Sequence, residues 1–289
     1  MSKRSSQRSC LVPLVIFFLL LALLGYGFSE ALRTVVYTIP TTKVTSPVRL
    51  VLLTDLHSCY YGEKQEKLLS AIDKAKPDLV CLVGDIFDDE ASHQGTIDLL
   101  DGLADRYPCF YVTGNHEHWS EEVWVLKALM ISYGVTVLAG DAVSFSTDDG
   151  QTLLLTGIDD PTGFYDKGTS GVPEPDSWLG QLAMVEEAAK DSPDFTLLLS
   201  HRPEKVAEYT ASPFDLVLAG HAHGGQVRIP FLVNGLFAPN QGYFPDYAGG
   251  LYALDDTTMI VSRGLCKNEM PRVFNRPEVV VVDIVPAQP

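Results

Sequence analysis

The sequence predicts an α/β layered fold organised as one domain. From Val48 onward, short runs of β-branched and aliphatic residues alternate with segments that have helical spacing, which is the pattern of strands joined by helices. Of the 289 residues, 46% are hydrophobic and five are cysteines. That composition excludes a disordered chain, which has fewer apolar residues, and a scaffold built from disulfides, which has more cysteines.

The charge of the chain excludes a further class of protein. The sequence has 21 Lys and Arg residues against 37 Asp and Glu residues, a formal net charge of −16. Proteins that bind the backbone of nucleic acids use Lys and Arg to displace counterions from phosphates, so no nucleic-acid partner is expected. Phosphate chemistry stays open, because bound metal ions can provide positive charge at one site.

The N-terminus carries the pattern of a membrane-insertion signal. Leu11 to Phe28 form an 18-residue run without a charged residue. Such a run is about 27 Å long as a helix, close to the thickness of a hydrocarbon core. The residues before it include Lys3, Arg4 and Arg8 and no acidic residue. Basic residues favour the cytoplasmic side, so the rest of the chain is expected outside the cytoplasm.

The predicted organisation is a cytoplasmic basic segment at 1–10, a transmembrane anchor at 11–28, a stalk at 29–47 and the folded domain at 48–289. Under this interpretation the protein is a single-pass protein of the cell membrane with an extracytoplasmic domain. A cleaved signal peptide is the alternative, because Gly25 and Gly27 form a weak cleavage pattern. Cleavage would make the protein secreted.

Seven apolar runs predict the buried strands. Each run is nearly continuous in aliphatic and aromatic residues, as in parallel strands that are covered on both faces. In chain order the predicted strands are 49–55, 79–85, 110–115, 135–138, 153–157, 195–200 and 215–220. Shorter β runs without helical spacing between them follow at 227–229, 250–254, 258–262 and 279–285.

Four segments between these strands have helical spacing. The first stops before Pro77, and the third begins at the capping residue Ser120 and ends at Gly134. In chain order the predicted helices are 68–76, 96–106, 120–134 and 178–189. Residues 159–177 have no period and are rich in Pro, Gly and Asp, so a surface loop or a lid is expected there.

Residues that can bind metals stand at the carboxyl ends of the predicted strands. They are Asp55 and His57, Asp85, Asn115 and His116, His201, and His221 and His223. Ligands of open α/β sheets bind beyond this edge, so these side chains are expected to converge. Imidazole, carboxylate and amide groups suit Mn, Fe, Zn or Co, and the lack of cysteine in the set argues against a structural zinc site.

These residues form an ordered signature that resembles the calcineurin-like metallophosphoesterase superfamily. The signature is D-x-H at 55–57, G-D at 84–85, G-N-H-E at 114–117, H at 201 and G-H-x-H at 220–223. The resemblance covers about residues 48–285, and residues 224–230 and 262–264 resemble a membrane-anchored bacterial branch. It implies a four-layer αββα sandwich of two mixed β-sheets flanked by helices, with an N-terminal transmembrane helix.

The resemblance also implies a centre of two divalent metal ions. One ion would be held by Asp55, His57, Asp85 and His223, and the other by Asp85, Asn115, His201 and His221. Asp85 would bridge them, because its two oxygens can bind two neighbouring cations.

The implied reaction is hydrolysis of a phosphomonoester, phosphodiester or pyrophosphate bond by a metal-bridging hydroxide. His116 would protonate the leaving oxygen, and His116 and Asp85 are the expected catalytic residues. Glu117 would orient the site through a hydrogen bond to a histidine. The expected substrate is a phosphorylated small molecule or lipid of a membrane or cell envelope.

Several alternatives stay open at this point. The chain could be a catalytically inactive scaffold of the same fold, or a metal-binding ectodomain without hydrolytic activity. Arg202 could hold a phosphate oxygen or pair with a carboxylate. Asn240, with two tyrosines near it in the sequence, could line a substrate cleft or could belong to a turn-rich hairpin connection. Cys59 and Cys266 could form a disulfide.

Overall fold

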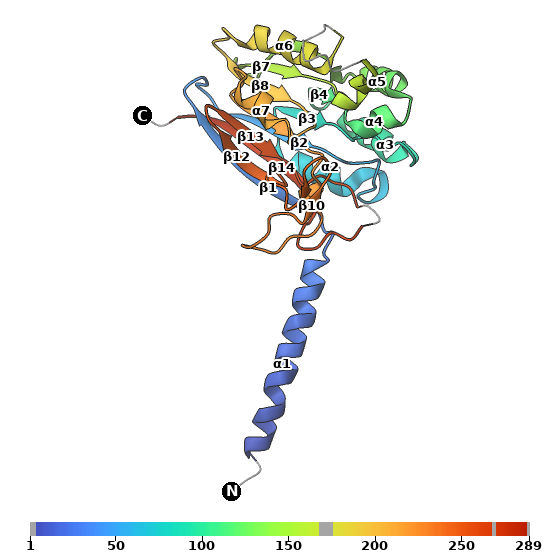
Figure 1. Ribbon diagram of the computed structural model, residues 1–289, viewed down its shortest axis with the longest axis vertical. Coiled ribbons are helices and arrows are strands. Elements are labelled where there is room, and N and C mark those ends of the chain that lie inside the picture. The colour runs from blue at the N-terminus through green and yellow to red at the C-terminus, as the bar shows by residue number, and fades with distance from the viewer. Residues whose placement is uncertain (1–3, 168–175, 268–269, 288–289) are drawn as a thin grey trace.

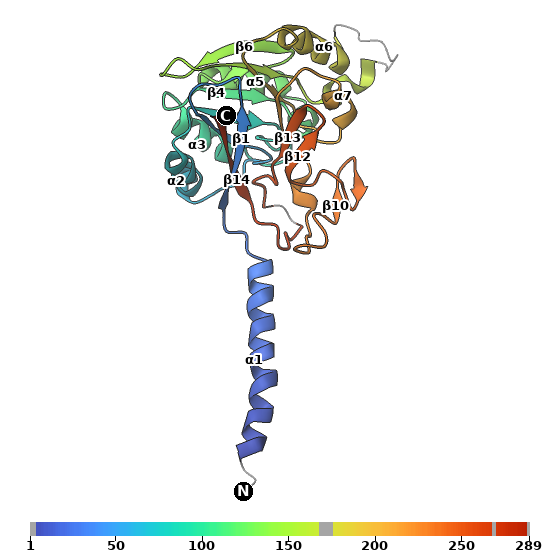
Figure 2. The ribbon, with the colours of Figure 1, turned by 90° about the vertical axis from the view of Figure 1, so that its left-hand side faces the viewer.

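The structure is a computed structural model that describes residues 4–167, 176–267 and 270–287. Helix α1 (Arg4–Gly27) projects from one end of a layered body, and the body contains all the other elements (Figures 1 and 2). The loop predicted at 159–177 lies partly outside the described residues. Its described beginning is a 3₁₀ helix, η2 (Pro161–Lys167).

Two six-stranded sheets form the centre of the body. Across the first sheet the order is β1 (Arg33–Thr41), β14 (Glu278–Pro286), β2 (Val48–Leu53), β3 (Leu79–Val83), β4 (Cys109–Val112) and β5 (Thr136–Val137). Across the second it is β12 (Gly250–Leu254), β13 (Thr257–Val261), β9 (Leu216–Ala219), β8 (Phe195–Leu199), β7 (Thr152–Gly157) and β6 (Asp141–Ser146). A two-stranded ribbon pairs β10 (Phe237–Ala238) with β11 (Gly242–Tyr243).

Both sheets are mixed, as the resemblance implied. Strands β2 to β5 are parallel, and β14 runs antiparallel to β2. Strands β7, β8, β9 and β13 are parallel, with the antiparallel strands β6 and β12 at the two edges. The parallel core strands therefore end at a common edge in each sheet, which is the edge that positions the site.

The alternation of side chains along a strand creates three apolar layers from these two sheets. In β2, Leu50 and Leu52 pack into the layer between the sheets, while Val51 and Leu53 pack under the helices on the outer face. Residues of both sheets, such as Leu52 and Leu197, share the central layer. Both faces of β2 are thus buried from Leu50 to Leu53, which explains the continuous apolar sequence of these four residues.

Helices cover the outer face of each sheet and complete the four layers. Helices α2 (Glu66–Ala75), α3 (Gln94–Leu103) and α5 (Val123–Ser132) share an apolar cluster with the first sheet. Helices α6 (Trp178–Ala189) and α7 (Val206–Thr210) share another with the second sheet. The predicted αββα sandwich is therefore confirmed.

The transmembrane prediction is not supported. Among the described residues, no helix has both the length and the apolar content needed to cross a membrane. Helix α1 ends at Gly27, so the predicted run from Leu11 to Phe28 is not helical to its end.

Two local structures differ from the sequence-based prediction. Strand β1 lies at 33–41, within the segment predicted as a stalk, and pairs in parallel with β14 at the sheet edge. Its side chains alternate in exposure, as expected for an edge strand. The helix predicted at 120–134 is preceded by a separate short helix, α4 (Asn115–Trp119), so the chain turns into a helix directly after the Gly114 turn.

Candidate metal centre

Both sheets contribute to one cluster of polar side chains. From the first sheet, Asp55 and His57 follow β2, Asp85 follows β3, and Asn115 opens α4 after β4. From the second sheet, His201 follows β8 and His221 follows β9, with His223 at the start of the 3₁₀ helix η3 (His223–Gly225). The predicted convergence of strand ends is thus realised across two sheets.

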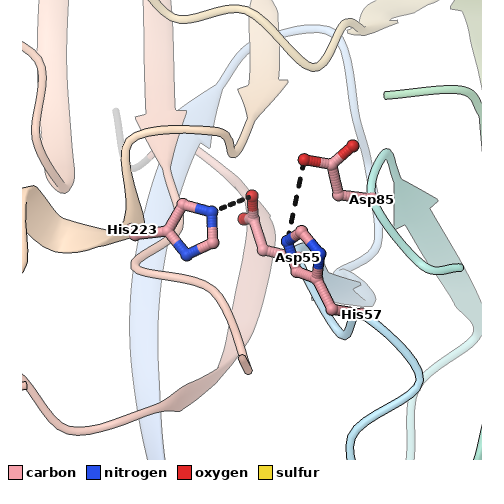
Figure 3. A group of neighbouring side chains, drawn as sticks. All are labelled: Asp55, His57, Asp85 and His223. Atoms are coloured by element: carbon pink, nitrogen blue, oxygen red, sulfur yellow. Dashed lines mark ion pairs between the residues drawn. The ribbon is translucent and has the colours of Figure 1, made fainter. Parts of the chain in front are cut away.

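The first group of possible ligands is Asp55, His57, Asp85 and His223, whose ligand atoms all lie within 4.8 Å of one another. Figure 3 shows the two imidazoles facing the two carboxylates. His223 Nε2 lies 3.5 Å from Asp55 Oδ1, and His57 Nε2 lies 3.7 Å from Asp85 Oδ2. At these distances the imidazole nitrogens and carboxylate oxygens are close enough to bind one cation between them.

A second group lies beside the first and shares one residue with it. Asp85, His201 and His221 also have ligand atoms within 4.8 Å of one another. His201 Nε2 lies 3.0 Å from Asp85 Oδ2 and 3.8 Å from Asp55 Oδ1. Asp85 belongs to both groups, which is the position that a bridging carboxylate requires.

The donor atoms of the cluster lack hydrogen-bond partners, which is the direct test of whether it fits a metal. Six of them are buried and, in the described part of the chain, have no hydrogen-bond partner apart from the contact between His201 Nε2 and Asp85 Oδ2: Asp55 Oδ2, His57 Nε2, Asp85 Oδ2, Asn115 Oδ1, His201 Nε2 and His223 Nδ1. Buried polar atoms are normally paired, because an unpaired one costs free energy. These six atoms are the types that divalent metals bind, so the site fits such ions.

The carboxylates keep two of the histidines protonated in the absence of metal. Burial lowers the pKa of His57, but the hydrogen bond to Asp88 and the charge of Asp85 outweigh it and raise the pKa to about 9. Burial likewise opposes the charge of His201, and Asp85 outweighs it and raises the pKa to about 10. A metal ion would therefore displace protons when it binds these nitrogens.

The other two histidines are held neutral. Burial, with the charges of His201 and Arg202, lowers the pKa of His221 to about 3. Burial and the charge of His57 lower the pKa of His223. These two imidazoles can bind a cation without first losing a proton.

Several possible ligands have an unusual backbone conformation. Five of them have positive φ angles of 46–63° and therefore lie in the left-handed region: Asp55, His57, Asp85, His221 and His223. Residues with a Cβ rarely adopt this region, and such strain is concentrated at functional sites. The tight turns aim successive side chains from each strand end into the same space.

Two glycines of the signature leave room for ligands. A Cβ on Gly84 would lie 2.2 Å from the His201 ring, and a Cβ on Gly114 would lie 2.2 Å from Asp85 Oδ1. No side chain fits at either position without moving His201 or Asp85. The glycines in G-D and G-N-H-E therefore have a steric role in assembling the site.

Glu117 supports the site in a different way from the prediction. Its carboxylate accepts hydrogen bonds from the backbone N–H groups of Gly114, Asp85, Ile86 and Phe87, and the structure shows no hydrogen bond from it to a histidine. A carboxylate with two oxygens can serve two loops at once. Glu117 thus ties the turn after β3 to the turn after β4, and it orients Asp85 through the main chain.

His116 lies beside the cluster and outside the two groups described above. Its ring is 4.2 Å from the His57 ring between centroids, and its Nδ1 lies 2.5 Å from Asp89 Oδ1. Asp88 in turn lies 3.2 Å from His57 Nδ1. Sequence reasoning missed Asp88 and Asp89, although the two acids three and four residues after Asp85 could have pointed to them.

Arg202 is paired with a carboxylate, which is one of the two roles that the sequence left open for it. Its guanidinium donates to both oxygens of the buried Asp160 and to Thr162 Oγ1. It also donates to Asn240 Oδ1, which lies 2.8 Å from His221 Nε2. Arg202 therefore helps to fix the position of His221, a possible ligand, both through Asn240 and directly, with its Nη1 2.9 Å from His221 Nε2.

Cys59 and Cys266 lie next to each other. Their Sγ atoms are 3.8 Å apart, and both thiols are free in the structure. The disulfide considered from the sequence stays a prediction, with both partners within reach of each other.

The chain is similar to known proteins over most of its length. The sequence model described as Calcineurin-like phosphoesterase matches residues 48–225. "Uncharacterized metallophosphoesterase YkuE" of Bacillus subtilis is 30% identical and is matched over 89% of this chain and 88% of that protein. "Phosphodiesterase YaeI" of Escherichia coli is 31% identical, over 83% of each chain.

The fold also occurs in a solved structure. Haemophilus influenzae NAD nucleotidase is similar over 76% of this chain and 45% of that chain, with a TM-score of 0.51 at 15% identity. At this identity the likeness concerns the fold alone. It agrees with the two mixed sheets described above.

Proposed function

The chain belongs to the calcineurin-like phosphoesterase family, and on that premise we propose that it hydrolyses phosphoester bonds at a binuclear metal centre. The observation that carries this proposal is the set of six buried donor atoms that have no hydrogen-bond partner outside the cluster among the described residues. An inactive scaffold has no need to keep such a costly arrangement. The likeness to a phosphodiesterase of Escherichia coli makes diesters the first substrates to test.

The two groups of donors would hold one ion each, with Asp85 shared between them. Asp55, His57 and His223 with Asp85 would hold one ion. Asp85, His201 and His221 with the unpaired oxygen of Asn115 would hold the other. When bound, divalent ions supply positive charge that stabilises a phosphate group and makes a coordinated water acidic.

The chain's own residues then position and protonate the substrate. His116 lines the cavity over the cluster and holds a ring nitrogen against Asp89, so the other ring nitrogen can carry a proton toward the leaving oxygen. Asp89 acts as a positioning residue, because its contact with Nδ1 fixes the ring. Monoesters, diesters and pyrophosphates all present such an oxygen.

Hydrolysis assays with two chromogenic substrates test the proposal. Purified protein is assayed with p-nitrophenyl phosphate and bis(p-nitrophenyl) phosphate, with Mn²⁺, Fe²⁺, Zn²⁺ or Co²⁺ added singly and after chelation. We expect hydrolysis of at least one substrate that is lost on chelation and restored by a metal. Activity that persists without metal, or no activity with any of the ions, would contradict the proposal.

His116→Ala separates an enzyme from a metal-binding domain. The variant should lose about 10²-fold or more in kcat, the range for loss of a general acid, while its metal content by mass spectrometry stays unchanged. A protein that only binds metal has no turnover to lose.

We also propose that the catalytic domain lies outside the cytoplasm. The proposal is supported by the basic residues Lys3, Arg4 and Arg8 before the apolar run, which together have the pattern of a secretory signal peptide. Protease added to intact cells should digest the domain. Protection from protease in intact cells, with digestion after lysis, would contradict this location.

A further inference from the structure

The residues that line the cavity over the candidate metal centre form a polar set and an apolar set, which we call its polar side and its apolar side. Its volume is about 280 Å³. The polar side is the ligand cluster with His116, and the apolar side is formed mainly by Trp119, Phe237, Pro239 and Met270. The phosphate chemistry proposed above uses the polar side and gives the apolar side no role.

The large apolar side chains of this side are exposed to solvent. The exposed fractions are 54% for Trp119, 43% for Phe237 and 59% for Met270. A single exposed apolar residue is ordinary, but several that share one cavity mark a binding site. Trp119 also packs edge-on against His116, with 4.7 Å between ring centroids, so the apolar side begins next to the residue proposed to protonate the leaving group.

The apolar side is fixed relative to the metal ligands. The backbone N–H of Leu236 donates to Gly225 O at 2.9 Å, which ties β10 to the turn that carries His223. After β10, Asn240 Oδ1 lies 2.8 Å from His221 Nε2. The Phe237 ring packs against Tyr243 on β11. An apolar group that lies on Phe237 would therefore sit at a set distance from a phosphate at the metals.

The polar groups left in the cavity are few. Among the described residues that line it, none is Lys or Arg. Asn240 is engaged with Arg202 and His221, and Gln226 has one unpaired side-chain oxygen. A nucleotide base or a sugar needs several donors and acceptors around it, whereas an alkyl chain needs only apolar contact.

We propose that Trp119, Phe237 and Met270 form a subsite for an alkyl chain, so that the substrate is a lipid-like phosphoester. The phosphate lies at the metal centre and the chain extends along the apolar side toward the exposed Tyr243 and Phe244. This inference rests on the proposed function, because it needs a phosphate held at the metals.

Binding of alkylphosphonates tests the subsite without requiring turnover. Methyl-, butyl- and octylphosphonate carry the same charged group and differ only in chain length, and they are used below the concentration at which they form micelles. Titration calorimetry with the Mn²⁺-loaded protein should show affinity that rises about threefold for each added methylene within the cavity, since each buries apolar surface. The gain should level off once the chain reaches the rim.

Matched substitutions test where the alkyl chain of the ligand lies. Phe237→Ala should remove at least half of the gain between methyl- and octylphosphonate and leave the affinity for methylphosphonate unchanged. Phe237→Leu should keep most of the gain. Phe231→Ala is the control, because Phe231 is fully exposed and does not line the cavity. Thermal unfolding confirms that each variant is folded.

The possible results separate the two proposals. Affinity that does not depend on chain length, or a gain that Phe237→Ala leaves intact, overturns the subsite. If Phe231→Ala loses as much of the gain in affinity as Phe237→Ala, the proposed subsite is also overturned, because the alkyl chain would then lie on the outer surface. Failure of methylphosphonate to bind, together with absence of hydrolysis of either chromogenic substrate, contradicts the proposed function itself.

Discussion

Two buried clusters of charged residues lie side by side in this protein and differ in how their polar atoms are paired. In the first, Arg202 donates to both oxygens of Asp160, and Asp160 also accepts from the backbone of Thr162. In the second, the cluster of possible metal ligands around Asp55 and Asp85, six buried atoms have no hydrogen-bond partner outside the cluster among the described residues. Both clusters are buried, but only in the first do side chains of the protein itself pair the charged groups.

The difference shows what burial of charge means in each place. Burial raises the pKa of Asp160, and the guanidinium of Arg202 outweighs this and lowers it, so the pair satisfies itself. At Asp55 burial dominates and raises the pKa, and the charges of His201 and His57 oppose it only in part. A cluster in this state is completed by positive charge from outside the chain.

Asp85→Asn should have the largest effect, because it removes the shared ligand and keeps the shape of the side chain. Hydrolysis should fall by about 10³-fold or more, and metal content should fall with it. Enzyme kinetics and elemental analysis measure the two losses. Asp160→Asn is the matched control in the complete cluster and should lower thermal stability while metal is retained. Equal metal content in wild type and Asp85→Asn would remove the distinction between the clusters.

Arg202→Met should give the largest loss of stability. The substitution leaves the buried Asp160 carboxylate without its partner, which costs about 3–5 kcal/mol in the free energy of unfolding. Urea denaturation measures this loss. Adding Asp160→Leu should recover part of it, because the double variant buries no unpaired charge. If Arg202→Met were as stable as wild type, Asp160 would not depend on Arg202 to balance its buried charge.

Glu117→Gln should give a smaller loss, of about 2–4 kcal/mol. The amide nitrogen would face two backbone N–H groups that now donate to a carboxylate oxygen, and each lost bond costs about 1–2 kcal/mol. Chemical denaturation of the metal-free protein measures the effect. Because Glu117 positions Asp85 only through the main chain, added metal should restore part of the stability. A loss confined to the metal-loaded protein would instead indicate direct action on the metal.

The pH dependence of stability should have opposite signs in the two metal states. Without metal, the raised pKa values of His57 and His201 stabilise the fold fully below pH 6.5, and this contribution is lost as pH rises through about 9 to 10. With metal the same nitrogens must be deprotonated, so metal affinity should rise about tenfold per pH unit for each displaced proton below these values.

Thermal unfolding at pH 6.5 and pH 9 tests this sign change. The chelated protein should be less stable at pH 9, and the Mn²⁺-loaded protein should be more stable there. The Arg202–Asp160 cluster should contribute equally at both values, because the lowered pKa of Asp160 lies far below them. The same slope with and without metal would show that the two histidines do not bind the ions.

The sequence predicted the parts of the molecule that depend on local pattern. Strand β2 is apolar on both faces and ends in Asp55 and His57, so its burial and the place of its ligands follow from a few neighbouring residues. The pairing of β1 with β14 could not be predicted in this way. It joins Arg33 to Glu278, which are 245 positions apart, and β1 lies at an edge where its apolar signal is weak.

The contacts around the candidate site were less predictable than the donors. Asp88, Asp89 and Phe237 lie in loops or short strands without a period, and their roles depend on which side chains fold against them. Glu117 was identified, but its partners are backbone groups that no sequence pattern displays. The side-chain chemistry of the site was therefore predictable, while its supporting contacts required the structure.

The left-handed conformation of the five possible ligands limits how this site can evolve. Each position demands both a donor side chain and a backbone angle that most residues resist, and glycine satisfies only the second demand. A ligand cannot be moved to the next residue, because the neighbouring Cα–Cβ bond points elsewhere. Descendants of this chain that lose one donor should therefore retain the fold and rarely regain the metal, so loss of the centre would be close to irreversible.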